Sequence, residues 1–493
     1  MPLTGKLSLY AVCLLFVWTV VWASVGATAY AAPRDWRAPI APAKTVVAGK
    51  TDTSVTLAWK ASKDDRGVEY YEIYNGSTRV GMSPEPAYLV TGLQPQTAYS
   101  FQVRAVDHGG NVSPFGASVT VTTLKKTADK AVIGYYTGWS TYSGHQIADI
   151  DGSRLTHINY AFANIGQNLQ IELGDKHADV EKRFAGDTAQ EPYYGNFNQL
   201  RKLKQRYPHL KTFISVGGWS WSGKFSDAAL SDASRTAFAE SAVAFITRYG
   251  FDGVDIDWEY PVAGGEASNA KRAEDKQNFT LLLKKLREKL DAQGKKDGKS
   301  YLLSIAGASG SFYRSNVELS KLQQYVDFVQ VMSYDFHGIW DSKTGLNAPL
   351  HRDPGSVFAH ESSVEDAMQG YMKAGVPPSK LVMGVPFYGY KYDAVTHTNK
   401  GLYQSFKGGK SVTYGQIMSS YLGKGYTRYL HPVSKVPYLF NGTSFISYDD
   451  PESIGYKAAY IKANGLAGAM IWSLTHDSDD GALLKALYKG LQP

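Results

Sequence analysis

The chain has 493 residues, of which 43% are hydrophobic and 20% are charged. This ordinary globular composition excludes disordered and collagen-like proteins, and the length fits one large barrel with an appendage or two to four domains. The net charge is +7, but no block of Lys and Arg stands out, so nucleic acid is not an expected partner. Aromatic residues make up 13% of the chain. Such a surplus often lines carbohydrate-binding clefts, although it also fills large cores.

Residues 1–31 are typical of a secretory signal peptide. Lys6 precedes an apolar run over residues 7–25, and Ala29-Tyr30-Ala31 has the small-x-small form of a cleavage site. The run is also long enough for an uncleaved membrane anchor, which is the alternative. The only cysteine, Cys13, lies inside this run, so the mature chain would contain no disulfide. We therefore expect a secreted, extracellular protein with no membrane attachment after cleavage.

Residues 32–43 are rich in Pro and Ala and are predicted to be a linker. In residues 44–124, which follow, apolar and polar residues alternate with a period of two. Alternating runs at 54–59, 70–74 and 99–106 are separated by turn residues, which predicts a small β-sandwich. Trp59 fits a buried tryptophan of an early strand, and Tyr99 fits a tyrosine corner. The segment resembles a fibronectin type III module. Because these are packing motifs, a spacer role is expected.

After a polar joint at 125–130, apolar runs alternate with amphipathic helices, which is the pattern of βα units. One such helix has an apolar face made by Phe279, Leu282, Leu283, Leu286 and Leu290. We therefore predict an α/β fold, a (β/α)₈ TIM barrel over residues 129–493, with a small α+β insertion at 390–447. The eight predicted strands are 131–136, 156–163, 212–216, 253–258, 301–306, 328–332, 381–387 and 469–473.

The fourth predicted strand carries a row of carboxylates. Alternate side chains of a strand share a face, so Asp255, Asp257 and Glu259 would point into the barrel while Trp258 faces the helices. Glu259 falls at the carboxyl end of the strand, where barrel enzymes keep their active sites. Neighbouring carboxylates repel one another, which pushes their pKa values apart and lets one act as an acid while another stays charged.

Four motifs in order resemble glycoside hydrolase family 18, and specifically its bacterial chitinases, over residues 130–490. The first is Asp-x-x-Asp-x-Asp-x-Glu from Asp252 to Glu259; the others are Ser215-Val216-Gly217-Gly218, Met332-Ser333-Tyr334-Asp335 and Trp472. The resemblance implies retaining, substrate-assisted hydrolysis, in which the 2-acetamido group of the sugar is the nucleophile.

The resemblance also implies the catalytic roles. Glu259 would protonate the glycosidic oxygen, and Asp257 would hydrogen-bond the acetamido N–H. Asp255 would share a proton with Asp257, and Tyr334 would donate its hydroxyl to the acetamido oxygen.

A second set of residues is expected to bind the sugar. Trp472 would stack under the sugar at the cleavage point. Further sugar platforms could be formed by Trp139, Trp219, Trp221 and Trp340, with loop anchoring or packing as the alternative for each. Tyr390 stands where many members of the family carry Arg, so one substrate contact is expected to differ. The other expected substrate contacts are Tyr135, Phe162, Met332, Asp335, Trp219, Trp139, Tyr388 and Gly218.

The expected partner is chitin or its N-acetylglucosamine oligosaccharides, cut at β-1,4 linkages. An endo-β-N-acetylglucosaminidase or a peptidoglycan hydrolase of the same family is the alternative; a non-enzymatic chitin-binding lectin is disfavoured because Glu259 is present. The 11 His residues show no metal-binding spacing, so neither a metal nor another cofactor is expected. A monomer is expected, while exo or endo action stays open.

Overall fold

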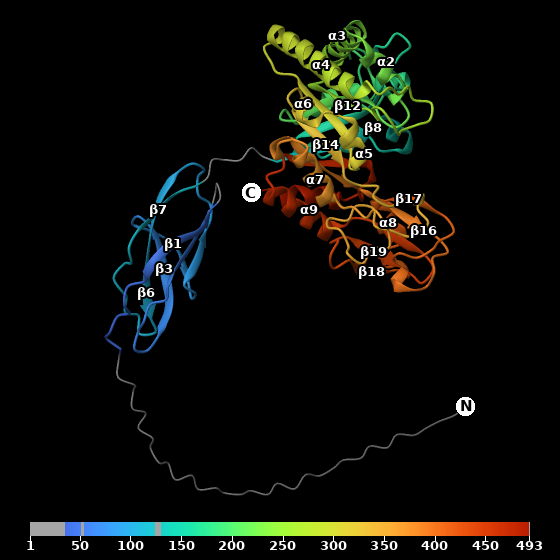
Figure 1. Ribbon diagram of the computed structural model, residues 1–493. Helices are drawn as coiled ribbons and strands as arrows, with labels where there is room; N and C mark the ends of the chain where they lie inside the picture. Colours follow the sequence, from blue (N-terminus) through green and yellow to red (C-terminus); the bar gives the residue numbers. More distant parts are fainter. Residues whose placement is uncertain (1–34, 51–53, 124–129, 493) are drawn as a thin grey trace, which may run out of the picture. The chain divides into compact units, whose positions relative to one another are not determined.

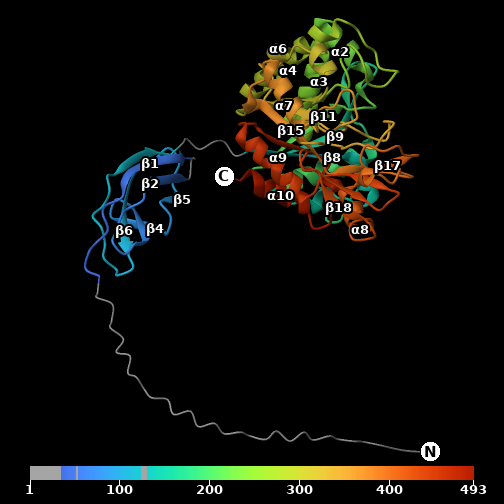
Figure 2. The same ribbon diagram turned by 60° about the horizontal axis from the view of Figure 1, so that its bottom comes forward.

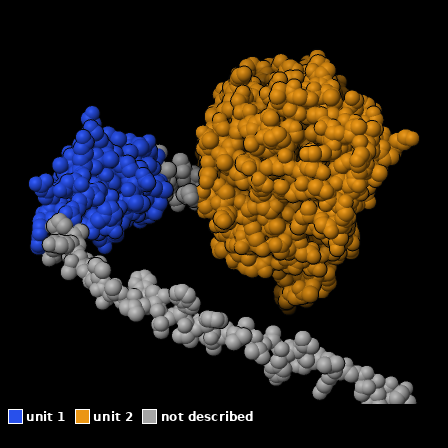
Figure 3. Space-filling view, turned by 90° about the horizontal axis from the view of Figure 1, so that it is seen from below, with its two compact units in different colours: residues 1–128 blue, residues 129–493 orange. Residues whose placement is uncertain are grey.

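The computed structural model describes residues 35–50, 54–123 and 130–492. The chain divides into two compact units, residues 1–128 and 129–493 (Figure 3). The predicted signal peptide, with Cys13, lies outside the described residues, as does the predicted joint except for Lys130. Among the residues that are described, no helix has both the length and the hydropathy needed to cross a bilayer.

The first unit is the predicted antiparallel β-sandwich (Figure 1). One sheet has the order β1-β2-β5 and the other β4-β3-β6-β7. The period of two in the sequence turns one side of each strand toward the partner sheet, where Leu57, Ile73 and Phe101 are buried. The strands are β1 Ala43–Lys50, β2 Val55–Lys60, β3 Val68–Asn75, β4 Thr78–Ser83, β5 Ala87–Val90, β6 Ala98–Asp107 and β7 Val119–Thr122.

Two packing predictions for this unit can be followed in its core. Trp59 is buried with its ring edge-on to Tyr71, the ring centroids 5.2 Å apart. The Tyr99 hydroxyl accepts a hydrogen bond from the Gln94 N–H at 2.8 Å, as a tyrosine corner requires. The stretch predicted as a linker is held to the sandwich in its described part, since the Ile40 N–H donates to the Lys63 carbonyl.

The second unit is the predicted eight-stranded parallel barrel, which confirms the fold class. The strand order is β9-β11-β12-β13-β14-β15-β21-β8, and the pairing of β8 with β9 closes the ring. A two-residue strand, β10 (Ile171–Glu172), adds to β9 in antiparallel fashion. The barrel strands are β8 Ala131–Thr137, β9 His157–Ile165, β11 Lys211–Gly217, β12 Gly253–Asp257, β13 Leu302–Ala308, β14 Phe328–Met332, β15 Leu381–Pro386 and β21 Gly468–Trp472.

Helices surround these strands (Figures 1 and 2). The apolar face predicted from Phe279 to Leu290 is buried on the longest of them, and a capping box of Ser231 and Ser234 fixes the start of α3. The helices are α1 Gly195–Arg206, α2 Phe225–Leu230, α3 Asp232–Tyr249, α4 Asp275–Asp297, α5 Ser311–Asn316, α6 Leu319–Leu322, α7 Val364–Lys373, α9 Pro451–Ala463 and α10 Ala482–Leu491. Short helical turns are Gly138–Ser143, Ile147–Asp149, Gly152–Arg154, His177–Glu181, Ser222–Lys224, Pro378–Lys380, Asn399–Gly401 and Leu474–His476.

An insertion follows β15 and forms a second, antiparallel sheet with the order β17-β16-β20-β19-β18. It begins at Tyr388, two residues before the predicted boundary, because the chain enters β16 almost directly after the barrel strand. Its elements are β16 Tyr388–Tyr392, β17 Gly409–Thr413, α8 Tyr414–Ser420, β18 Thr427–Leu430, β19 Pro437–Phe440 and β20 Phe445–Ser447. Because β16 continues from a barrel strand, its tyrosines lie next to the barrel mouth.

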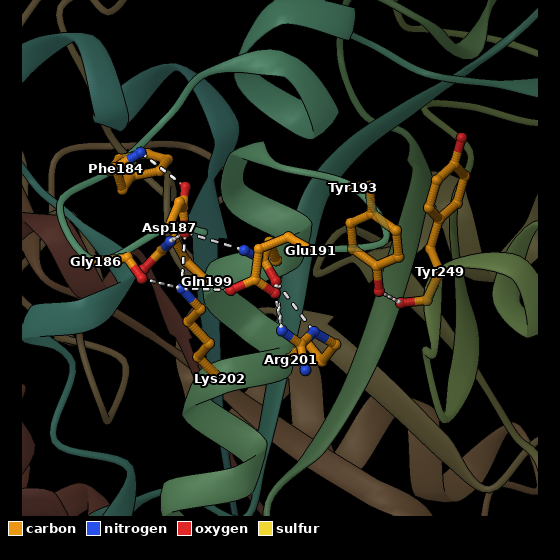
Figure 4. A network of polar contacts seen from close by, with 10 residues as sticks. Phe184, Gly186, Asp187, Glu191, Tyr193, Gln199, Arg201, Lys202 and Tyr249 are labelled. Atoms are coloured by element: carbon orange, nitrogen blue, oxygen red, sulfur yellow. Dashed lines mark hydrogen bonds and ion pairs between the residues drawn. The ribbon is translucent and has the colours of Figure 1, made fainter. Parts of the chain in front are cut away.

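The long loop before α1 is fixed by a polar network (Figure 4). Asp187 accepts hydrogen bonds from the Phe184 N–H at 2.8 Å and from the Lys202 ammonium at 2.7 Å. Arg201 of α1 forms an ion pair with Glu191 of the same loop. These contacts tie the loop to a helix rather than leaving it free in solvent.

Candidate active site

Strand β12 delivers the acidic side chains to the interior of the barrel. In the parallel register, Asp255 lies between Ser215 of β11 and Ser304 of β13. Asp255, Asp257 and Glu259 are all buried, whereas Trp258 packs outward on Phe225 of α2, with ring centroids 5.4 Å apart. The alternation predicted for this strand therefore holds, and it stacks three carboxyl groups toward the carboxyl end of the barrel.

Asp255 is the deepest of the three and is fully enclosed by hydrogen-bond donors. Its Oδ1 accepts from the Ser304 hydroxyl at 2.6 Å and from Gln330 Nε2 at 2.9 Å. Its Oδ2 accepts from the hydroxyls of Tyr135 at 2.6 Å and Ser215 at 2.7 Å. Burial raises the pKa of Asp255, and these four donors oppose that rise. The resemblance implies a proton shared between Asp255 and Asp257, and that stays a prediction. The four hydrogen bonds that Asp255 accepts come from Tyr135, Ser215, Ser304 and Gln330.

Asp257 and Glu259 are buried with far fewer hydrogen-bond donors than Asp255 to offset the cost of burying their charge. Burial, and then the charges of Glu259 and Asp255, raise the pKa of Asp257 well above its usual value. Burial also raises the pKa of Glu259 to about 7, with the Asp335 carboxylate adding to the rise and the Tyr260 hydroxyl opposing it. The buried Asp257 Oδ1 accepts no hydrogen bond from any residue that the structure describes. The pair can therefore hold a proton near neutral pH and leaves one acceptor open to a ligand.

The backbone around these carboxyl groups is fixed from neighbouring loops. The Glu259 N–H donates to the Ser222 hydroxyl at 2.8 Å, and Asn269 Nδ2 donates to the Glu259 carbonyl at 3.0 Å. Gly218 has a φ of +72°, and a Cβ there would come within 2.7 Å of the Phe162 ring. A glycine is therefore needed at this turn, because a side chain would displace an aromatic residue of the site.

Asp335 faces the same cavity from the end of β14. Its Oδ1 accepts from the hydroxyls of Tyr388 at 2.5 Å and Tyr390 at 2.7 Å, and its N–H donates to Asn347 Oδ1 at 2.9 Å. Its φ is +57°, a left-handed conformation that Asp tolerates better than most residues. Tyr390 thus contacts Asp335 directly.

These side chains enclose a cavity of about 240 Å³. Trp472 forms part of its wall, with its ring stacked on Phe162 at 5.9 Å and tilted against Tyr135 at 5.4 Å. The cavity is lined by Tyr135, Trp219, Asp257, Glu259, Ala306, Met332, Tyr334, Asp335, Tyr388, Met470 and Trp472. Most of the predicted site residues are thus brought together. A larger hollow of about 540 Å³ beside the loop from 477 to 481 holds none of them.

Three further aromatic residues that the sequence singled out line a hollow that shares Trp219, Glu259 and Trp472 with this cavity. Phe162, Trp139 and Trp221 line a continuing hollow with Trp219, Glu259 and Trp472. Trp139, Trp219 and Trp340 are each about half exposed or more, which suits stacking on a sugar ring. Trp340 packs edge-on to Tyr390, with ring centroids 5.2 Å apart. Aromatic side chains therefore continue from the cavity at Glu259 along Phe162, Trp139 and Trp221.

Several site residues were missed from the sequence. Ser215, Ser304 and Gln330 surround Asp255, and each is a polar residue on an inward position of an otherwise apolar strand, which is the signal that could have found them. Ser222 begins a short helical turn and Asn269 lies in a loop, and no periodicity marks either position. Tyr390, which the sequence already marked as a substrate contact that would differ, enters through the inserted sheet.

Comparison with known families identifies the barrel. The profile of Glycosyl hydrolases family 18 matches residues 131–477, and that of the Fibronectin type III domain matches residues 41–122. The chain belongs to glycosyl hydrolase family 18. Both resemblances seen in the sequence are thereby confirmed. The TIM barrel is the family 18 enzyme domain, and the sandwich is the fibronectin type III domain.

Three similar proteins are informative about this family 18 chain. "Chitinase A1" of Niallia circulans is 48% identical over 393 residues, covering 70% of this chain and 56% of that protein, so the chain spans little more than half the length of this relative. The solved structure of chitinase ChiA74 from Bacillus thuringiensis matches with a TM-score of 0.71 at 39% identity, over 74% of this chain and 70% of that one. A family 18 N-acetylglucosaminidase from Paenibacillus barengoltzii matches with a TM-score of 0.65 at 39% identity, over 73% of this chain and all of that one.

Proposed function

We propose that this chain is a secreted chitinase that hydrolyses β-1,4 linkages between N-acetylglucosamine units with retention of configuration. The observation that carries the proposal is the buried column Asp255, Asp257 and Glu259, which opens into an aromatic cavity. The 48% identity to a chitinase supports the substrate class. The signal-like residues 1–31 support export.

In the proposed mechanism Glu259 is the general acid. It donates its proton to the glycosidic oxygen while the acetamido carbonyl oxygen of the same substrate attacks the anomeric carbon, so the leaving sugar departs with the proton. The oxazolinium ion that results is opened by water, from which Glu259 takes a proton, and the Glu259 carboxyl group is restored. No protein nucleophile is required.

Asp257 and Tyr334 stabilise the acetamido group in this scheme. The unpaired Asp257 Oδ1 accepts the acetamido N–H, and the positive charge that develops on the nitrogen favours the ionised form of Asp257. The buried Tyr334 hydroxyl, whose protein neighbour is the Met470 sulfur at 3.8 Å, donates to the acetamido oxygen. Asp255, held by four donors, contributes through its charge to the raised pKa of Asp257.

The function is tested by a time course of products from a six-unit N-acetylglucosamine oligomer, followed by mass spectrometry. We expect dimers and trimers early, and no cleavage of the fully deacetylated oligomer, because it brings no internal nucleophile. Early release of monomers alone would favour an N-acetylglucosaminidase, the activity named for the matching structure from Paenibacillus barengoltzii. Cleavage of the deacetylated oligomer would contradict substrate assistance.

The pH dependence follows from the protonation of Glu259. Its raised pKa of about 7 means that the acid form is present below that pH and is lost above it. We expect kcat/KM on the N-acetylated oligomer to fall about tenfold per unit above pH ~7, because this parameter reports the free enzyme. A decline that begins near pH 4.5, the ordinary value for Glu, would contradict the assignment.

A further inference from the structure

We propose that the sandwich unit binds a Ca²⁺ ion between Asp35, Asp64 and Asp107, a site separate from the barrel's chemistry. One oxygen atom from each of these carboxylates lies within 4.8 Å of the other two. Oxygens that bind one Ca²⁺ at ~2.3–2.6 Å are at most ~5 Å apart, so the observed spacing suits a shared ion. The three residues come from the segment before β1, the β2–β3 loop and the end of β6.

Asp35 supplies an independent indication of a cation. Its side chain is only 7% exposed, and its Oδ2 is buried and accepts no hydrogen bond from the described residues, whereas its Oδ1 accepts from the Arg37 N–H at 3.0 Å. The exposed Arg66 side chain forms a long ion pair with this Oδ2, with its Nε 3.8 Å away, which is beyond hydrogen-bond length. A buried anionic oxygen without a donor is costly, and a directly bound cation would remove that cost.

The surrounding loops hold the other two carboxylates in place. Asp107 is fully buried, and its Oδ1 accepts from the N–H groups of Gly109 and Asn111, both at 2.8 Å. Asn111 Nδ2 donates to Asp107 Oδ2 at 2.9 Å and to the Asp35 carbonyl at 3.1 Å. A Cβ at Gly109 would come within 2.9 Å of the Asp35 Cβ, so the close approach of the two segments depends on this glycine. Asp64 is held through its Oδ2, which accepts from the Arg66 N–H at 2.8 Å.

The donor set favours Ca²⁺ over other metals. All three donors are carboxylate oxygens, which hard cations prefer, whereas structural zinc sites are built from Cys and His. Mg²⁺ requires near-octahedral geometry and keeps several waters, while Ca²⁺ accepts irregular sets of six to eight oxygens. Three carboxylates from three separate segments form such an irregular set. The bound ion would fasten the chain entering β1 to two loops of the sandwich.

The test is a titration of the metal-free full chain with CaCl₂ by calorimetry. A Tb³⁺ luminescence titration, sensitised by Trp36 next to Asp35, would run beside it. We expect a site with Kd about 10⁻⁴–10⁻³ M, as in other extracellular modules. Asp64→Asn should weaken binding by about tenfold or more, because a charged ligand is lost. The matched control is Asp65→Asn, since Asp65 is an exposed neighbour paired with Arg37 at 3.7 Å and should bind like the parent.

Thermal unfolding separates loss of the site from loss of the fold. Ca²⁺ at ten times Kd should raise the Tm of the parent sandwich by roughly 5–10 °C and should leave that of Asp64→Asn unchanged. In EDTA, which removes the metal, the parent and Asp64→Asn should have the same Tm. If Asp64→Asn is itself unstable, Asp35→Asn is used in its place. Absence of saturable binding up to about 10 mM, or equal affinity in Asp64→Asn and Asp65→Asn, would overturn the proposal.

Discussion

Replacing Glu259 by glutamine should lower kcat on N-acetylglucosamine oligomers by about 10²–10⁴-fold while leaving KM within a few-fold of the parent. Glutamine keeps the size and shape of the side chain in the 240 Å³ cavity but has no acidic proton to give to the leaving oxygen. Initial rates on a six-unit oligomer, measured with the two proteins at matched concentration, provide the comparison.

The control for this substitution is Glu288→Gln on α4, because Glu288 is exposed and makes only a distant ion pair with Lys285 at 3.8 Å. It should retain the parent rate, since such surface pairs contribute little. If Glu259→Gln kept more than a tenth of the parent kcat, another group would have to be the acid.

Replacing Asp257 by asparagine should lower kcat by about 10²–10³-fold, again with a small change in KM. The Asp257 Oδ1 is a buried oxygen that accepts no hydrogen bond from the described residues, so it is free to orient the acetamido N–H. Asparagine can still accept that hydrogen bond, but it cannot ionise as positive charge develops on the nitrogen. The loss is therefore expected in the chemical step rather than in binding.

Asp291→Asn on α4 is the matched control, because Asp291 is exposed and pairs only with Arg287 of its own helix. It should behave as the parent. A decrease of less than about threefold for Asp257→Asn would show that the acetamido group is not activated by this residue.

The barrel could be predicted because each strand can be recognised from its local hydrophobic pattern alone. Each is a short apolar run between amphipathic helices, so all eight appear in the sequence, and Gly253–Asp257 is confirmed with its inward carboxylates. The period-two pattern likewise predicts that Trp258 packs outside the barrel, where it contacts Phe225 and Phe279.

The contacts around the carboxylates were harder to predict because they depend on tertiary structure. Ser222, at the start of a short helical turn, and Asn269, in a loop, contact the Glu259 backbone from segments whose path no periodic pattern sets. Tyr390 contacts Asp335 only because the inserted sheet starts directly after β15. The Asp35 cluster was also missed, since a Pro- and Ala-rich segment was expected to be a linker and not to bury a carboxylate.

The stereochemistry of the first product tests the central proposal most directly. A six-unit N-acetylglucosamine oligomer would be mixed with enzyme in an NMR tube, and the anomeric protons would be recorded before mutarotation equilibrates them. Attack by the acetamido group followed by water predicts that the β-anomer appears first. Early formation of the α-anomer would contradict the proposed mechanism, and an oligomer that stays intact would contradict the proposed chitinase function.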